Sequence, residues 1–293
     1  MQVHTAQPET LEDLSRAWEA GRILTAQVLL CDEAHNLHIS VAGHPGVIPR
    51  SEAALGVAEG TVREVAILSR VGHPVACKVT SIGPDGVVRL SRAAAQREAL
   101  DHLMRTARPG DILPAVVVNL APFGAFCDVG CGVIALLGIE NISVARIEHS
   151  ADRFFEGQRI CAVVSAVDHA ARRLCLTHKE LLGDWAGNAA RFRPGQTVPG
   201  IVRGVKDYGV FVELTPNLSG LAEPDGTLRV GDGVSVYIKT ILPEKMKVKL
   251  AIIGRLDAAA LPRQPLRYTQ TEGHLDAWRY GPLPGKPETV FTP

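Results

Sequence analysis

The feature that most constrains the fold of this chain is a pattern that starts three times. Gly21, Gly110 and Gly195, at intervals of 89 and 85 residues, each open a series of short apolar runs separated by Gly, Pro, Asp and His. Each series closes with a run in which apolar and polar residues alternate: VVRLS, LCLT and KVKLA. Short runs of this kind, joined by turn residues, are typical of β-strands. We therefore predict three tandem copies of one β module.

The segments between these modules have helical composition and set the predicted boundaries. Thr10 and Asp13 form a capping pattern for a short helix that packs Leu14 and Trp18 on the first module. Residues 93–108 and 178–192 are helical linkers, and the second carries apolar residues that pack between modules: Leu181, Leu182 and Trp185. The predicted order is an N-terminal helix 1–20, a first module 21–92, a linker helix 93–108, a second module 109–177, a linker helix 178–193, a third module 194–253 and a Pro-rich tail 254–293.

The C-terminal tail contains one informative segment. Its Pro-rich stretches PRQPLRY and PLPGKPE predict extended or disordered chain. Between them HLDAWRY brings Trp278 and Tyr280, which are too apolar for a free tail. We expect this segment to dock on a module, and a partner-binding peptide remains the alternative.

Charge is balanced over the whole chain and uneven along it. The 31 basic residues equal the 31 acidic residues, so the net charge indicates neither a nucleic acid nor a membrane as partner. Residues 185–255, however, carry a net charge of +4, with 10 basic and 6 acidic residues. Arg191 and Arg193, just before the third module, either extend this positive region or form an ordinary solvated linker end.

The remaining composition argues against several other classes. The six cysteines include no CxxC and lie mostly in apolar runs, which predicts reduced core residues. His35, His38 and His44 with Cys31 match no zinc spacing, so no metal or other cofactor is expected. No catalytic triad or phosphate-binding loop appears, which predicts a protein that is not an enzyme. The start of the chain resembles no leader, and no apolar run approaches the ~20 residues of a membrane span, so we expect a cytoplasmic protein.

A recurring pair of rings is the strongest functional signal. Phe123 and Phe126 surround Gly124, and Tyr208 and Phe211 surround Gly209 in the same way. Residues three apart on a strand share a face only where the strand begins or bends, and glycine permits this. Rings on the outside of a barrel offer stacking surfaces to unpaired bases. The alternative, in which both rings are core residues, is weakened by the second copy.

The two later modules resemble the S1 RNA-binding domain. The matching segments are PGDILPAVVVNLAPFGAFCDV in module two, and PGQTVPGIVRGVKDYGVFVEL with VGDGVSVYI in module three. This resemblance implies an all-β fold class: three tandem five-stranded OB-fold (S1-type) barrels joined by short helices. The three-copy layout is similar to shortened bacterial relatives of a small-subunit ribosomal protein.

The family's binding positions carry over unequally to the three modules. Module one is degenerate, because the ring positions fall on Ala34 and Leu37. The family's histidine falls near Pro49, Gly138 and Glu223 and is therefore absent from all three modules. The family's late acidic and basic pair falls on Asp168 and Arg172 in module two and on Leu242 and Met246 in module three, where nearby lysines replace it. The predicted RNA-binding residues are Phe123, Phe126, Asp168, Arg172, Arg173, Tyr208, Phe211, Lys245 and Lys247.

These observations predict a monomer that binds single-stranded RNA with little sequence preference. The resemblance implies a partnership with messenger RNA in translation, on the small ribosomal subunit. A general RNA chaperone or regulator is an alternative from the same chemistry. The zero net charge and the ringless first module also leave open a protein-interaction scaffold.

Overall fold

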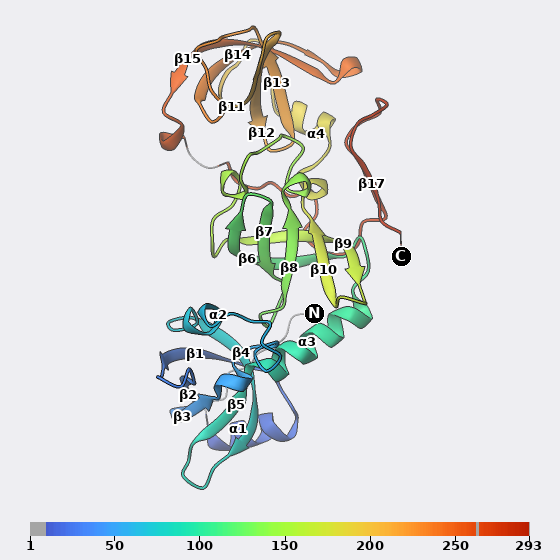
Figure 1. Ribbon diagram of the computed structural model, residues 1–293. Coiled ribbons are helices and arrows are strands. Elements are labelled where there is room, and N and C mark those ends of the chain that lie inside the picture. The colour runs from blue at the N-terminus through green and yellow to red at the C-terminus, as the bar shows by residue number, and fades with distance from the viewer. Residues whose placement is uncertain (1–9, 262–263, 293) are drawn as a thin grey trace. The chain divides into compact units, whose positions relative to one another are not determined.

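The computed structural model describes residues 10–261 and 264–292, which form two compact units. The first unit holds the described chain as far as Thr106, together with Asp128–Val133. The second holds Ala107–Cys127 and the described chain from Ile134 onward. Three closed five-stranded barrels follow one another along the chain, the first in unit one and the others in unit two (Figure 1). The predicted fold of three tandem barrels is confirmed.

The barrels share one strand order, in which the third and fifth strands are neighbours. This pair is parallel in every barrel, as the register pairs Gly46↔Val88, Leu136↔Cys175 and Leu221↔Lys249 show, whereas the other strand pairs that are described are antiparallel. Closure removes sheet edges, and alternation along each strand sends one set of side chains inward as the core. The first barrel consists of β1 (Leu24–Cys31), β2 (Leu37–Val41), β3 (His44–Ile48), β4 (Pro74–Ile82) and β5 (Val88–Ser91).

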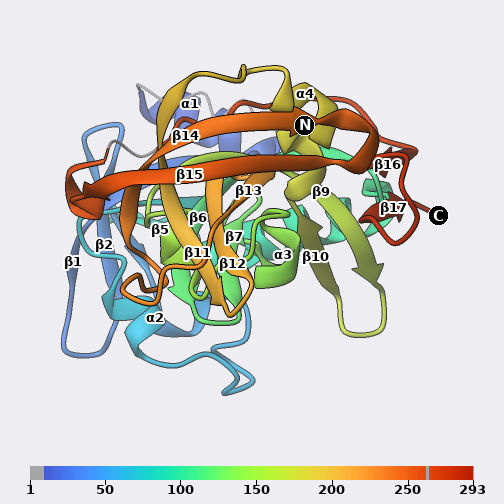
Figure 2. The same ribbon diagram turned by 90° about the horizontal axis from the view of Figure 1, so that it is seen from above.

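The second and third barrels are built in the same way. Strands β14 and β15 of the third barrel are its longest pair and run side by side as a ribbon (Figure 2). The second barrel consists of β6 (Ile112–Ala121), β7 (Gly124–Asp128), β8 (Ile134–Gly138), β9 (Arg159–Asp168) and β10 (Arg173–Thr177). The third consists of β11 (Thr197–Lys206), β12 (Gly209–Thr215), β13 (Leu218–Ala222), β14 (Gly233–Leu242) and β15 (Lys247–Leu256).

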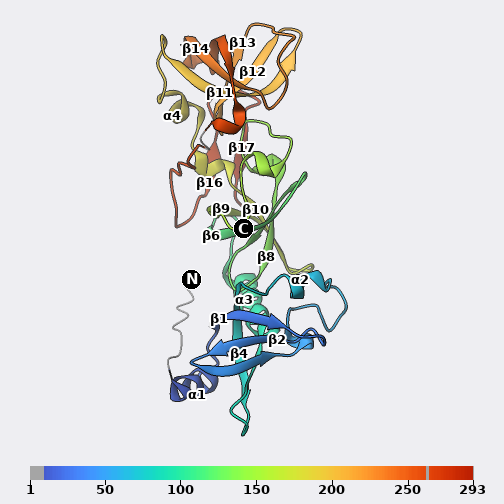
Figure 3. The ribbon, with the colours of Figure 1, turned by 90° about the vertical axis from the view of Figure 1, so that its left-hand side faces the viewer.

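The N-terminal helix α1 (Leu11–Glu19) is capped as the sequence predicted. The Thr10 hydroxyl accepts the Asp13 backbone N–H, and the Asp13 carboxylate accepts the Thr10 backbone N–H in return. Leu14 is fully buried in the core of the first barrel, and Figure 3 shows α1 beside that barrel. Trp18 differs from the expectation, because 43% of it is exposed. The helix therefore docks through Leu14 and Ala17, which are both buried in that core.

The linkers differ in how well the sequence predicted them. Helix α3 (Arg92–Thr106) follows the first barrel as expected, and α2 (Val65–Leu68) is a short turn within that barrel. The helix expected over residues 178–192 is instead a 3₁₀ turn, Lys179–Leu182, followed by a short α4 (Trp185–Ala189). Gly183 between them has a φ of 81°, which an α-helix cannot contain. Leu181, Leu182 and Trp185 are buried, as predicted.

The described part of the tail lies against the second unit. It forms a small hairpin of β16 (Ala277–Arg279) and β17 (Glu288–Val290). Tyr280 is buried in the core cluster of the third barrel, and Phe291 is buried with Ile112 of the second. The expectation that HLDAWRY docks on a module is thus met on both barrels of this unit. Five 3₁₀ turns complete the described elements outside the linker: Arg50–Glu52, Ile139–Asn141, Ser150–Asp152, Pro243–Lys245 and Ala258–Ala260.

Candidate nucleic-acid interface

The two ring pairs have the same geometry in the second and third barrels. Phe123 and Phe126 lie edge to face, with ring centroids 5.9 Å apart and an interplanar angle of 87°. Tyr208 and Phe211 repeat this arrangement at 6.1 Å and 90°. Phe123 is 58% exposed and Tyr208 66% exposed, while the second ring of each pair is half-buried. The rings therefore lie on the barrel surface and are not core residues.

A glycine within each pair lets a neighbouring strand pass close to it. A Cβ on Gly124 would lie 2.3 Å from the carbonyl oxygen of Leu137 in β8. A Cβ on Gly209 would lie 2.5 Å from the carbonyl oxygen of Ala222 in β13. Both glycines also have positive φ, 154° and 155°. Only glycine fits at the start of these strands, and this start brings residues three apart to one surface.

In the third barrel a lysine lies in register with the second ring. Phe211 pairs with Leu221 across β12 and β13, and Leu221 pairs with Lys249 across β13 and β15. Lys247 lies two residues earlier on β15, so its side chain shares the outer face with Lys249, and both are exposed. The predicted residue Lys245 is exposed in the adjoining 3₁₀ turn. Lys249 was not among the predicted residues, although its alternation with buried Val248 and Leu250 was a readable signal.

The second barrel places its charged candidates at a hairpin. Asp168 and Arg173 are partners across β9 and β10, and Arg172 has a φ of 50° in the turn between them. The Asp168 carboxylate accepts the backbone N–H of Ala171 at 2.8 Å, so one of its roles is to close this turn. The position that corresponds to Lys249 is the exposed Cys175, paired with Leu136. The predicted basic candidates of this barrel, Arg172 and Arg173, therefore lie together at one turn.

The first barrel has no ring pair among its described residues, and the structure corrects which residue of β2 takes the second ring position. Leu37, placed at the second ring position by sequence offset, is fully buried. The outward residue on β2 is the next one, His38, which is half-exposed and contacts the Asp32 carboxylate at 2.9 Å. This hydrogen bond, with others from Asn36, holds the pKa of Asp32 well below its usual range. Ala34 lies exposed in the preceding turn.

A buried ion cluster joins the second and third barrels. Both Glu213 oxygens accept hydrogen bonds from Arg153, at 2.6 and 3.0 Å, and one also accepts from Arg203 at 2.7 Å. Burial alone would raise the pKa of Glu213, but the two arginines outweigh it and hold that pKa below its usual range. Arg153 comes from the second barrel, and the other two residues come from the third.

Asn217, in the turn after β12, is a second connection between the barrels. Its side chain accepts the Val144 N–H at 3.0 Å and donates to the carbonyls of Lys179 and Gly183 at 2.8 Å each. Its own carbonyl accepts the Tyr280 hydroxyl at 2.6 Å. One fully buried residue thus ties together the second barrel, the linker, the third barrel and the tail.

His178 connects the tail to the second barrel. It is fully buried, with Nδ1 2.8 Å from the Ile142 carbonyl and Nε2 3.1 Å from the Tyr268 hydroxyl. Burial is the main cause that lowers the pKa of His178 to about 4, and nearby Arg153 lowers it further. A neutral ring satisfies both contacts, because Nδ1–H donates to the carbonyl and Nε2 accepts from the hydroxyl. These connections make one unit of the two ring-bearing barrels.

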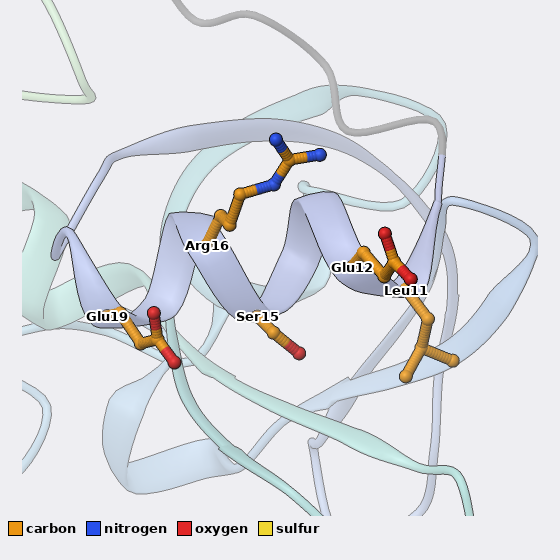
Figure 4. Close-up of a pocket in the computed structure, with 5 residues that line it drawn as sticks. All are labelled: Leu11, Glu12, Ser15, Arg16 and Glu19. Atoms are coloured by element: carbon orange, nitrogen blue, oxygen red, sulfur yellow. The ribbon is translucent and has the colours of Figure 1, made fainter.

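Other kinds of site receive little support within the described ranges. No group of three or more His, Cys, Asp and Glu side chains there is placed to hold a metal ion. A search of the same residues finds no helix long and apolar enough to cross a membrane. One shallow depression lies on α1, and its five lining residues all come from that helix (Figure 4). Two acids, one arginine, one serine and one leucine on a single helix face indicate a solvated surface.

Comparison with known proteins finds similarity to one domain family and to small ribosomal subunit proteins. The family model described as "S1 RNA binding domain" matches residues 106–179, the second barrel. Small ribosomal subunit protein bS1 of Leuconostoc lactis is 29% identical over 263 residues, which cover 82% of this chain and 59% of that protein. The bS1 homolog of Bacillus subtilis (strain 168) is 26% identical over 258 residues, which cover 82% of this chain and 65% of that protein. The bS1 protein of Rhizobium meliloti (strain 1021) is 28% identical over 184 residues, which cover 58% of this chain and 32% of that protein.

The chain therefore spans about one third to two thirds of the length of these relatives. The matched model covers the barrel with the Phe123 and Phe126 pair, and the longer alignments extend over most of the chain. These matches identify the second barrel as an S1-type domain, and together with the three barrels of one topology they show that the chain is similar to small ribosomal subunit protein bS1.

Proposed function

We propose that the second and third barrels bind single-stranded RNA through their ring pairs, and that the protein engages messenger RNA on the small ribosomal subunit. The observation that carries this proposal is the repetition of one exposed ring geometry in both barrels. Each ring that stacks on a base contributes about 1–3 kcal/mol, with little dependence on sequence. Exposed Lys247 and Lys249, with the turn arginines of the second barrel, supply charges for the phosphates.

Having both faces in one compact unit supports stronger binding than either gives alone. Once one barrel has bound an RNA strand, that RNA is at a high effective concentration for the other barrel. The overall affinity is therefore higher than the affinity of either barrel alone. Association with the small subunit is supported by the relatives, which are small ribosomal subunit proteins.

Removal of the exposed rings tests the RNA proposal. We expect the double variant Phe123→Ala and Tyr208→Ala to bind a mixed single-stranded RNA at least about tenfold more weakly at low salt. Fluorescence anisotropy of a labelled strand measures this. Phe155→Ala is the matched control, because it removes another exposed ring of the second barrel, 49% exposed. Equal affinity of the double variant and the control would refute stacking by these rings.

Co-sedimentation separates a translation role from that of a general RNA chaperone. We expect the intact protein to sediment with small ribosomal subunits, and the double ring variant to recruit less messenger RNA to them. RNA binding without co-sedimentation would favour the chaperone.

An apolar surface on the first barrel favours an additional role in docking on protein. Five large apolar residues are exposed there, and backbone hydrogen bonds between Val28 and the segment Gly72–His73 join the two stretches that carry them. They are Leu29, Leu30, Val65, Leu68 and Val71. We expect Leu30→Gln with Val65→Gln to weaken co-sedimentation with subunits and leave RNA affinity unchanged. Loss of RNA affinity would contradict this division of roles.

A further inference from the structure

A cavity beside the linker combines charged and aromatic side chains in its walls. Its volume is about 520 Å³, and its walls come from the linker around α4, from residues 267–269 and from β16. No ring of either pair lines it. It therefore differs from the candidate interface described above.

Five charged residues line this cavity, and three of them already have partners. The buried Glu180 carboxylate accepts the hydroxyls of Thr177 at 2.5 Å and Thr289 at 2.8 Å. Asp184 accepts the Gly187 N–H at 2.7 Å as the cap of α4. The Arg279 guanidinium lies 3.3 Å from the Glu288 carboxylate. These three charges are engaged within the protein.

The two remaining arginines have no acidic partner in the part of the chain that is described. Arg191 and Arg267 are both exposed, and both line the cavity. They come from segments far apart in sequence, so the fold brings these like charges together. Burial and the positive charge of Arg267 both lower the pKa of Arg191, which agrees with their proximity. Such a pair without an acid is unfavourable until an anion joins it.

The third unused group in this wall is also a donor. The indole N–H of Trp278 is buried and has no acceptor among the described residues. Trp278 belongs to the hairpin segment that the sequence singled out as too apolar for a free tail. The cavity thus holds two guanidinium groups and one indole N–H without an acidic partner or acceptor among the described residues, and both of its carboxylates, Glu180 and Asp184, accept hydrogen bonds within the protein. Arginine forks match phosphate oxygens in geometry as well as charge.

We propose that this cavity is a second RNA contact, in which Arg191 and Arg267 bind a phosphate of a single strand held by the barrels. The inference rests on the proposed RNA binding and adds a site outside the S1-type ring faces. Phosphate is favoured over an acidic peptide because the two arginines meet at one concave place, whereas a peptide would need a row of basic groups. Inorganic pyrophosphate presents the same chemistry without a strand.

A salt series with matched variants tests the proposal. The test variant is Arg191→Gln with Arg267→Gln, and the control is Arg146→Gln with Arg229→Gln, which removes the same charge at exposed arginines outside the cavity. A labelled oligouridylate of about 16 nucleotides is titrated by anisotropy between 50 and 200 mM salt. We expect the log–log slope of the test variant to be shallower by about 0.7 for each lost phosphate contact. The control keeps the wild-type slope.

The outcomes separate this proposal from the one on which it rests. Equal slopes and affinities for test variant and control, with RNA still bound, would overturn the cavity as a contact and leave ring binding intact. If the wild type bound no RNA, calorimetric titration with pyrophosphate would still test the cavity. Pyrophosphate binding that is lost in the test variant and kept in the control supports a phosphate site. Absence of pyrophosphate binding in the wild type overturns it. Equal competition by a polyglutamate peptide and pyrophosphate would also overturn a preference for phosphate.

Discussion

Gly209 shows how a single backbone position determines whether the ring pair can form. The carbonyl oxygen of Ala222 lies where a Cβ would stand, so any side chain must push β13 away from β12. We expect Gly209→Ala to lower the free energy of unfolding by about 1–3 kcal/mol, the range of overpacked sites. Urea denaturation measures this change, and RNA affinity should fall with it because the strand start moves.

Gly226 is the matched control for this change. A Cβ there meets no atom within 4 Å, and its φ is not in the left-handed region. We expect Gly226→Ala to leave stability and RNA affinity as they are. A Gly209→Ala protein as stable as the control would show that β13 can shift without penalty.

His178 makes the stability of the second unit depend on pH. Its pKa is about 4 in the folded protein and near its ordinary value of 6.5 in the unfolded chain, so the unfolded chain binds the proton first. Stability is therefore greatest above pH 6.5 and falls as the pH drops toward 4, by about 1.4 kcal/mol per unit. A charged ring would also no longer accept the Tyr268 hydroxyl.

The His178→Gln variant isolates this contribution. Glutamine does not titrate, so we expect its urea midpoint to change less between pH 7 and pH 5 than that of the wild type. Carboxylates elsewhere titrate in both proteins and cancel in the comparison. The same pH dependence in both proteins would mean that His178 does not cause it.

At the scale of elements, strands were more predictable than the connections between them. Alternating runs and turn residues act over a few positions and predicted the three β modules, Ala- and Leu-rich composition predicted α3, and the family resemblance supplied the barrel closure. The single helix expected over residues 178–192 is interrupted at Gly183, whose positive φ a helix cannot contain and whose low helix propensity was a signal that the sequence carried. Lys249 was missed for a different reason, since its place beside Phe211 requires the register of three strands.

Asn217 is an example of an element connection that the sequence alone does not reveal. In the run ELTPNLSG it looks like an ordinary turn residue, yet its side-chain partners are 34, 38 and 73 residues away. Asn217→Ala leaves one buried N–H and two buried carbonyls without a partner. We expect a loss of about 2–4 kcal/mol in the free energy of unfolding, measured by urea denaturation. The exposed Asn119 of β6 provides the control, and Asn119→Ala should be neutral.

At the scale of the whole molecule, the second unit joins two S1-type barrels that each have a complete strand set. Short linkers usually leave such modules free to move, but here a buried ion cluster, Asn217 and the tail all lie between them. Buried ion pairs often add little net stability, while removal of one partner is strongly destabilising. The cluster is therefore best understood as a device that selects one arrangement within this unit.

Glu213→Gln tests this coupling. The amide keeps the shape of the carboxylate but removes the negative charge between Arg153 and Arg203, and Arg203 keeps only its longer contact with Asp152 at 3.5 Å among the described ion pairs. Removal of one partner of a buried pair costs about 3–5 kcal/mol. We expect the wild-type second unit to melt in one calorimetric transition and the variant to show two, one for each barrel. Glu223→Gln, which breaks only the exposed pair with Lys239, should keep one transition. Strong binding by both barrels requires that their ring faces are held together. The Glu213→Gln protein should therefore also bind RNA more weakly, although every ring is intact. Unchanged RNA affinity would show that the ion cluster serves stability alone.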